Sequence, residues 1–480
     1  MRARGAGYGP SRVLGGPHYR RGPAIGVLVT LLAAGLPPAW AAPSGRHAPA
    51  PVLPFAQAVR LSLTRAPAIT EAEGALTEAH GQHLSALAAF LPTVSASDGE
   101  QLYAPLGPQS STVIAGTLVS TRGRFYDNAA TVSAQWNLFD GGKDVAGYRA
   151  AALGLQSAEQ GLESAVNTTL IKVVGAYEAV VADQIRVHLD TRIVSWDRRI
   201  SDLTQKRYRH LIASRLAVLQ ALQQLITAQT TEINDRTQEA EDRETLARAI
   251  GLAGTQAVRV ADALPAPPPI PAGARAPRSA PSVVSARAAW EAARENVRVA
   301  EAGYWPTLAV TGQYNWLGLD PGSAETAFMQ THGNNYTVGL TLSWTLFPLI
   351  NTGGAVESAE GQALSAEGTY HHAEVIGRRR WQAARSLYRT ARANARAAAQ
   401  AVRWAHETVT LTKARVHGAQ ASALALAQAE VARLQALTTE RVAVLAQTLT
   451  AWKLLRADAP KRFAARLLRV AQGGVRGAHR

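Results

Sequence analysis

Two hydrophobic patterns alternate along this chain, and each of them occurs twice. Within the expected strand at about 335–347, apolar residues recur at every second position over 336–346, which places them all on one face of an extended strand. The same alternation runs over 129–139 and 307–317. It is weaker over 93–103, where Asp98 and Glu100 fall on the face that carries Val94. The pattern predicts four strands of about 10 residues each.

A long helical pattern follows each pair of strands. No proline occurs from Gly142 to about Tyr208, or from Gly354 to about Val416, and apolar residues recur throughout both stretches. After short breaks the pattern resumes, to about residue 250 and to about residue 456. A helix of the first length spans roughly 100 Å and needs a partner to be stable. We therefore expect two helical hairpins, over about 142–250 and 354–456.

The chain contains an internal repeat. Pro92 and Pro306 are 214 residues apart, Trp136 and Trp344 are 208 apart, and Gly141 and Gly353 are 212 apart. Three landmarks in the same order predict two strand-strand-helix-helix units. We expect a first repeat over 42–262, a proline-rich linker over 263–282, a second repeat over 283–458 and a basic tail over 459–480.

Residues 1–41 have the features of a secretory signal. Five arginines without an acidic residue precede a short apolar stretch, and a small-residue cleavage site ends at Ala41. The sequence contains no cysteine, which argues against disulfides and against a lipoprotein anchor. Since no run of 18 apolar residues follows the signal, we expect an exported chain that is either free in the periplasm or inserted as a β-barrel.

The formal charge of +15 does not indicate nucleic acid binding. Much of the excess lies in the signal and in the tail, which has no acidic residue. On an exported protein such a tail is expected to meet anionic lipid, lipopolysaccharide or solvent.

The strands match a membrane better than a soluble sandwich. Their length suits a tilted bilayer crossing, and tryptophan or tyrosine lies near their ends. Four strands cannot close a barrel alone, so oligomerisation is expected. The predicted lipid-facing residues are Val132, Trp136, Leu138, Tyr314, Trp316, Val338, Leu340, Leu342 and Trp344.

No catalytic or cofactor-binding set is present in the sequence. Gly141-Gly142-Lys143 lacks the spacing of a phosphate loop and predicts a turn before a helix. The pairs His80/His83 and His371/His372 have no third ligand at metal-binding spacing. We therefore expect no enzyme, no cofactor and no metal site.

The two hairpin turns are the best candidates for a docking and gating site. They occupy the same place in each repeat, at the far end of a very long helix. The candidate tip residues are Arg207, Tyr208, His210, Leu211, Ser214, Arg415, His417 and Gly418.

Together, the repeat, the proline-strand junctions and the segment 138–142 resemble the TolC-like outer membrane efflux proteins. The resemblance implies a homotrimer in which each subunit gives four strands to one twelve-stranded outer-membrane barrel, continued by a periplasmic helical tunnel. It also implies a passive exit duct for a tripartite efflux or type I secretion system, with a periplasmic adaptor and an inner-membrane RND or ABC-type pump as partners.

Three positions in the two tips depart from the family pattern. Leu211 stands where the first tip usually has glycine, and Leu424 and Ala427 stand near positions where some relatives carry gating aspartates. We expect closure through helix packing and basic groups such as Arg415.

Two alternatives remain open on the sequence. One is a periplasmic adaptor, although adaptors have one hairpin rather than two. The other is a soluble periplasmic coiled-coil scaffold or an anion-binding protein that uses the arginine-rich stretch 378–396, and it predicts extraction without detergent. The transported substrate, the pump and the adaptor are not indicated.

Overall fold

The computed structural model describes residues 52–104, 110–114, 117–121, 125–252, 259–261, 264–269, 280–320, 322–329, 331–347, 349–418 and 420–477. The chain divides into two units, 1–49 and 50–480, and only the second contains described residues. The expected signal at 1–41 and most of the expected linker at 263–282 lie outside the described residues.

Four long strands form one antiparallel sheet in the order β2-β5-β7-β8. They are β2 (Thr93–Tyr103), β5 (Phe125–Phe139), β7 (Thr307–Asp320) and β8 (Thr331–Ser343). Each repeat contributes two neighbouring strands, and the repeats join between β5 and β7. Strand β8 ends four residues before the expected limit of 347, because its last paired residue, Ser343, lies opposite Thr307, the first residue of β7.

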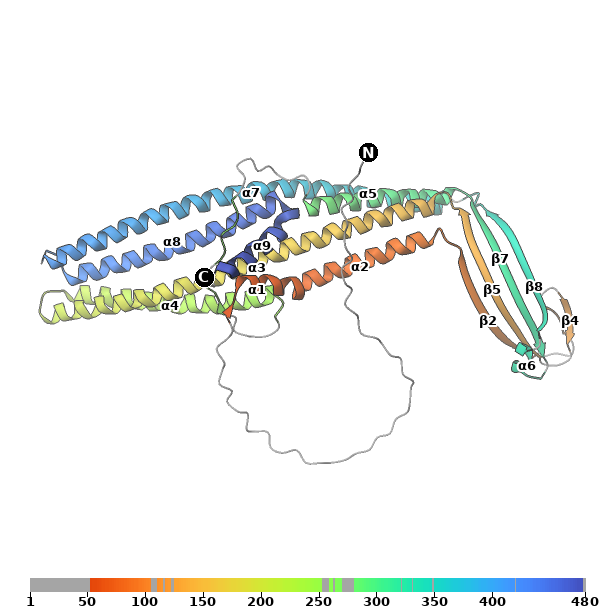
Figure 1. The fold of residues 1–480 in the computed structure, drawn as a ribbon, viewed down its shortest axis with the longest axis horizontal. Coiled ribbons are helices and arrows are strands. Elements are labelled where there is room, and N and C mark those ends of the chain that lie inside the picture. Colours follow the sequence, from red (N-terminus) through yellow and green to blue (C-terminus); the bar gives the residue numbers. More distant parts are fainter. Residues whose placement is uncertain are drawn as a thin grey trace, which may run out of the picture. The chain divides into compact units, whose positions relative to one another are not determined.

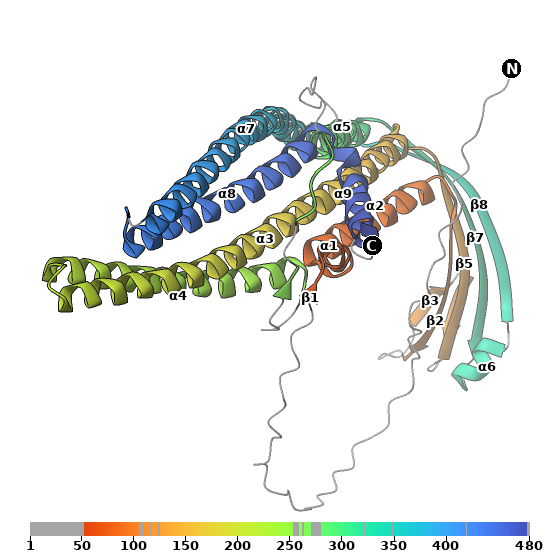
Figure 2. The same cartoon turned by 60° about the vertical axis from the view of Figure 1, so that its left-hand side comes forward.

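The helices extend from one end of this sheet (Figure 1). α2 (Pro67–Ala88) and α5 (Pro281–Glu301) lead into the strands, and both pack against the long helix α3 (Lys143–Arg209). α3 turns back as α4 (Arg215–Ala249), and α7 (Leu349–His417) turns back as α8 (Ala423–Asp458). Figure 2 shows that the turns of both hairpins lie away from the sheet, and α3 of the first hairpin packs against α8 of the second.

Shorter elements complete the described chain. β1 (Val52–Leu53) pairs in parallel with β6 (Arg259–Val260), and β3 (Ser110–Ile114) forms a hairpin with β4 (Thr117–Thr121). The helix α6 (Ala324–Met329) lies in the loop between β7 and β8.

In both repeats an equivalent tryptophan links the end of a strand to the end of a helix by a hydrogen bond. The indole N–H of Trp136 donates to the carbonyl of Phe90 over 3.1 Å, and the indole N–H of Trp344 donates to the carbonyl of Tyr304 over 3.3 Å. At the same junction Gly141 has φ of +72°, and a Cβ there would lie 2.8 Å from the carbonyl of Ala302. Only glycine fits this contact between the two repeats.

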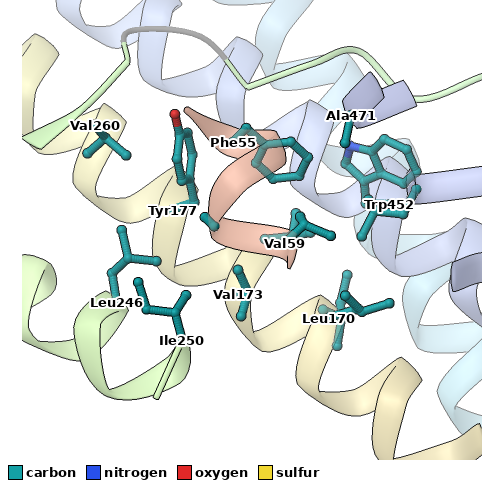
Figure 3. Close-up of a cluster of buried hydrophobic side chains, with 14 of the residues drawn as sticks. Phe55, Val59, Leu170, Val173, Tyr177, Leu246, Ile250, Val260, Trp452 and Ala471 are labelled. Atoms are coloured by element: carbon teal, nitrogen blue, oxygen red, sulfur yellow. The ribbon is translucent and has the colours of Figure 1, made fainter. Parts of the chain in front are cut away.

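The main core lies midway along the helices, where both ends of the described chain meet (Figure 3). α1 (Phe55–Arg65) inserts Phe55 against Tyr177 of α3, with ring centroids 5.2 Å apart. The Tyr177 hydroxyl donates to the carbonyls of Leu53 and Ala261, over 3.3 and 3.2 Å. These bonds attach the short β1/β6 sheet to the long helices.

The basic tail is a helix, α9 (Pro460–Gly477), that forms part of this core. Its residues Phe463, Leu467 and Ala471 repeat every four positions and are buried, while Lys461, Arg462 and Arg469 are exposed. The expected basic tail is therefore a helix with one exposed basic side, while its other side packs on α1, α3 and α8.

One described helix, α3, has an 18-residue window apolar enough for a membrane span, but 61% of that window is buried inside the protein. Burial against α4, α5 and α8 explains its apolar composition.

Candidate functional site

The register of the sheet brings predicted lipid-facing residues from three strands onto one face. Val132 lies opposite Tyr314, which lies opposite Tyr336, and Trp136 lies opposite Val310, which lies opposite Leu340. Directly opposed residues share a face. Trp316, Val338 and Leu342 fall on the same face by alternation. The exposed fractions of Val338, Leu340 and Leu342 are 74%, 66% and 68%, which is unusual for adjacent large apolar side chains.

Two of the predicted residues lie at the edges of this pattern. The register shifts between Asn137 and Phe139, so Phe139 rather than Leu138 lies opposite Leu308. Leu138 is the extra residue of this bulge, which sequence alternation alone could not reveal. Trp344 follows the last residue of β8 and is held by its bond to Tyr304.

The other face of the sheet is polar. Ser95 and Ser133 are joined by a hydroxyl hydrogen bond of 2.8 Å. The Thr131 hydroxyl donates to Asn315 over 2.8 Å, and the Asn315 amide donates to Asn335 over 2.8 Å. Over β5, β7 and β8 the sheet thus separates a hydrogen-bonded polar face from an exposed apolar face, whereas on β2 the apolar face also carries Asp98, which accepts a hydrogen bond from Asn128 over 3.0 Å.

Leu211 gives the first hairpin turn an uncommon backbone. Its φ is +59°, and it is the only non-glycine residue with positive φ in the described part of the chain. The Ile212 amide donates to the Arg207 carbonyl over 2.8 Å, and the Leu211 amide donates to the Tyr208 carbonyl over 2.9 Å. These two bonds define a Schellman ending, whose left-handed position is usually glycine.

The second turn repeats this arrangement at an offset of 208 residues. The Arg415 carbonyl accepts the amides of Gln420 and Ala421, as that of Arg207 accepts the amides of Ile212 and Ala213. Ser214 and Ser422 then cap the returning helices, each accepting the third backbone amide over 3.2 Å. The two tips therefore share one backbone design.

The tip side chains are mostly open to solvent. Arg415, His417 and Gly418 are exposed on the second tip, and Tyr208, His210 and Ser214 on the first, where Arg207 is half-buried. Leu211 is 93% exposed and its neighbour Ile212 is 66% exposed. The predicted tip residues thus gather on two turns with protruding apolar and basic groups.

Sequence reasoning missed a row of buried carboxyl groups on α3. Asp183, Asp190 and Asp197 are seven residues apart and 1%, 9% and 2% exposed. Asp183 faces Asp242 and pairs with Arg186, Asp190 faces Asp235, and Asp197 accepts a hydrogen bond from Gln224 over 3.1 Å. The heptad spacing was the available signal, since it places all three on the seam with α4.

Burial and carboxyl pairing raise the pKa of two of these aspartates. Desolvation first, and then the hydrogen bond with Asp242, raises the pKa of Asp183 to about 6, against the attraction of Arg186. Desolvation and the hydrogen bond with Asp235 raise the pKa of Asp190 to about 7. One proton shared across each pair relieves the repulsion between two carboxylates.

The sheet face and the hairpin tips lie at opposite ends of the helices and form no common cavity (Figure 1). No group of three or more histidine and acidic residues suited to a metal ion occurs in the described part of the chain. The arrangement suits insertion into a membrane at the sheet end and docking of another protein at the hairpin tips.

The family model for outer membrane efflux proteins matches residues 58–252 and 274–457. No curated protein matches the sequence. These two matched segments contain the two strand-strand-helix-helix units.

Solved structures of outer membrane channels have the same fold. VceC of Vibrio cholerae is 18% identical with a TM-score of 0.69, over 84% of this chain and 95% of that chain. CmeC of Campylobacter jejuni is 14% identical with a TM-score of 0.68, over 87% and 89%. MtrE of Neisseria gonorrhoeae is 16% identical with a TM-score of 0.66, over 84% and 88%. The predicted fold class is confirmed.

The family match covers most of the chain and fixes its cellular location. The sheet end lies in the outer membrane, and the helical part lies in the periplasm. The chain belongs to the outer membrane efflux protein family.

Proposed function

We propose that three copies of this chain assemble into an exit duct of a tripartite efflux or secretion system. The observation that carries the proposal is the open four-stranded sheet with one exposed apolar face. Its strands are 11 to 15 residues long, sufficient to cross the hydrocarbon layer at a tilt.

The open edges of the sheet support assembly. Strands β2 and β8 each have one neighbour in the described sheet, and unpaired strand edges cannot face lipid. Three copies would join β8 of one subunit to β2 of the next and close a barrel. The lipid-facing residues would then be Val132, Trp136, Leu138, Tyr314, Trp316, Val338, Leu340, Leu342 and Trp344, and the polar ladder would line the lumen.

The helices carry a second surface suited to neighbouring copies. On α4, Leu219, Ile226 and Ile233 are seven residues apart, and each is more than half exposed. A heptad row of large apolar residues without a partner in the described chain is suited to packing against a helix of another subunit.

The tips are proposed to dock a periplasmic adaptor and to form the gate. Protruding Leu211 and Ile212 supply apolar contact area, and Arg207 and Arg415 supply charge. The duct is a passive conduit rather than an enzyme, and an inner-membrane pump supplies the energy. The domain division into repeats at 42–262 and 283–458 is part of this proposal.

Reconstitution into a planar lipid bilayer tests the conduit. The purified full chain should produce discrete steps of ion conductance. A folded, membrane-inserted protein that never produces steps would contradict the proposal. Release of the native protein by salt without detergent would instead favour the soluble scaffold.

A further inference from the structure

A cavity of 340 Å³ lies within the helical part, away from both the sheet and the tips. Five helices contribute to it: α3, the start of α5, α7, α8 and the start of α9. The volume is at the lower end of the range for small-molecule sites. The proposed duct function does not use this cavity.

The charge of the cavity is positive. Arg380 of α7 and Lys453 and Arg456 of α8 line it, and no acidic residue is among its described lining residues. Lys453 lies near the Glu178 carboxylate, whose charge it stabilises. Arg380 and Arg456 make no ion pair in the part of the chain that the structure describes.

The two arginines repel each other at this position. Burial, followed by the charge of Arg380, lowers the pKa of Arg456. Arg456 is half-buried whereas Arg380 is exposed to solvent, so an anion between them would mainly compensate the Arg456 guanidinium. This arrangement indicates an anionic ligand, for which arginine provides paired donors.

Further polar groups surround the arginines. Helix α5 begins at Pro281, which has no N–H, and the amides of Val283 and Val284 donate to the Ala280 carbonyl, so the first turn offers the cavity only the Ser282 amide and hydroxyl. Ser164 and Thr168 of α3 add hydroxyl groups. Asn167 is 4% exposed and donates its Nδ2 to the Pro460 carbonyl over 3.0 Å, but its Oδ1 has no partner.

The unpartnered Oδ1 of Asn167 indicates which chemical groups the ligand carries. It requires a donor, which a carboxylate lacks and a monoprotonated phosphate ester supplies through its P–OH group. The rest of the lining includes Ile171, Ala384, Leu387 and Pro281, which suit a short aliphatic chain.

We propose that this cavity binds an organic phosphate, a phosphate group carried on a short aliphatic chain. The phosphate lies between Arg380 and Arg456 and donates to Asn167, and the chain lies against Ile171 and Leu387. Such a ligand could be a lipid headgroup fragment or a small solute, and both present the same chemistry.

Binding of octyl phosphate to the full-length protein in a neutral detergent tests this site. Isothermal titration calorimetry should give one site per subunit. The double variant R380Q/R456Q should weaken binding at least tenfold, while R378Q/R379Q removes the same charge from exposed positions outside the cavity and should bind as the parent does. Inorganic phosphate and octanol should each bind more weakly than octyl phosphate.

Light scattering must show the same subunit number for all variants, which separates binding from folding. Equal binding by R380Q/R456Q and the parent would overturn the proposal. Equal binding of octanol and octyl phosphate would also overturn it, since the cavity would then select only the chain. Neither result depends on ion conductance, so the duct proposal is tested separately.

Discussion

Asp190 of α3 faces Asp235 of α4, and burial together with this carboxyl neighbour raises the pKa of Asp190 to about 7. Glu232 lies on the same side and adds negative charge, while Arg186 opposes it. Asp190 and Asp197 also line a cavity of 560 Å³ between α3, α4 and α8, whose other lining residues are largely glutamine and threonine. The hairpin seam is therefore polar, and it includes a carboxyl group whose pKa is raised to about 7.

This pairing predicts that the helical part becomes less stable as the pH rises. The pKa of Asp190 is about 7 in the folded protein and near 3.8 when unperturbed, so the folded protein binds the proton more tightly. The free energy of unfolding therefore falls as pH increases from about 4 through about 7, and then becomes level. Thermal unfolding followed by circular dichroism across this range measures the effect.

Asp190→Asn should remove much of this dependence. At pH 8 the variant should be more stable than the parent by on the order of 1 kcal/mol, because a neutral amide replaces a repelled carboxylate. At pH 5 the two should differ little. Asp202→Asn, at an exposed position on the same helix, is the control. An equal change at both pH values would show that the pair is not the cause.

Leu211→Gly should stabilise the first tip. A left-handed leucine costs roughly 1 kcal/mol that glycine does not, and the Schellman bonds at Arg207 and Tyr208 are retained. Hydrogen exchange should show the amides of Ile212 and Ala213 protected about fivefold more. Ile212→Gly, one residue further on, should not increase the protection of these amides. An equal increase in that variant would show that the positive φ of Leu211 is not the cause of the stabilisation.

Leu340→Arg should prevent insertion of the sheet. A charge on the lipid face near the centre of a barrel strand costs about 2–4 kcal/mol. Thr341→Arg adds the same charge to the opposite face of β8 and should be tolerated. The amount of each protein in the outer-membrane fraction is the measurement. Similar losses for both variants would contradict the assignment of faces.

Arg415→Ala should increase the conductance of the closed duct. Arg415 is exposed on the second tip, where we propose that basic groups help to hold the closed arrangement. Arg441→Ala removes an exposed arginine from α8 away from the turn and serves as the control. An unchanged closed-state leak in Arg415→Ala would exclude this role.

The regular elements were predictable because their patterns are long and uninterrupted. Alternation over 335–347 marks a strand with one apolar face, and the absence of proline after Gly142 marks a helix of tunnel length. The positions of the two turns could also be predicted, because the long helical pattern breaks at matching positions of the two repeats. The placement of Val132, Tyr314 and Leu340 on one face of the sheet follows from the alternation along each strand and from the pairing of neighbouring strands.

The remaining features depend on contacts between distant segments. In the sequence of α9, the many arginines make the four-residue spacing of Phe463 and Leu467 hard to recognise. The segment therefore resembles a basic tail rather than a helix with a buried side. The bulge at Leu138 and the positive φ of Leu211 are backbone choices that no side-chain pattern fixes. The carboxyl pair of Asp190 and Asp235 is visible only once α3 and α4 are placed side by side.

Location and subunit number of the native protein test the central claim most directly. Inner and outer membranes are separated, the protein is extracted with mild detergent, and its mass is determined by light scattering. A trimer in the outer-membrane fraction is the predicted result. A monomer or dimer that is released without detergent would contradict the exit duct.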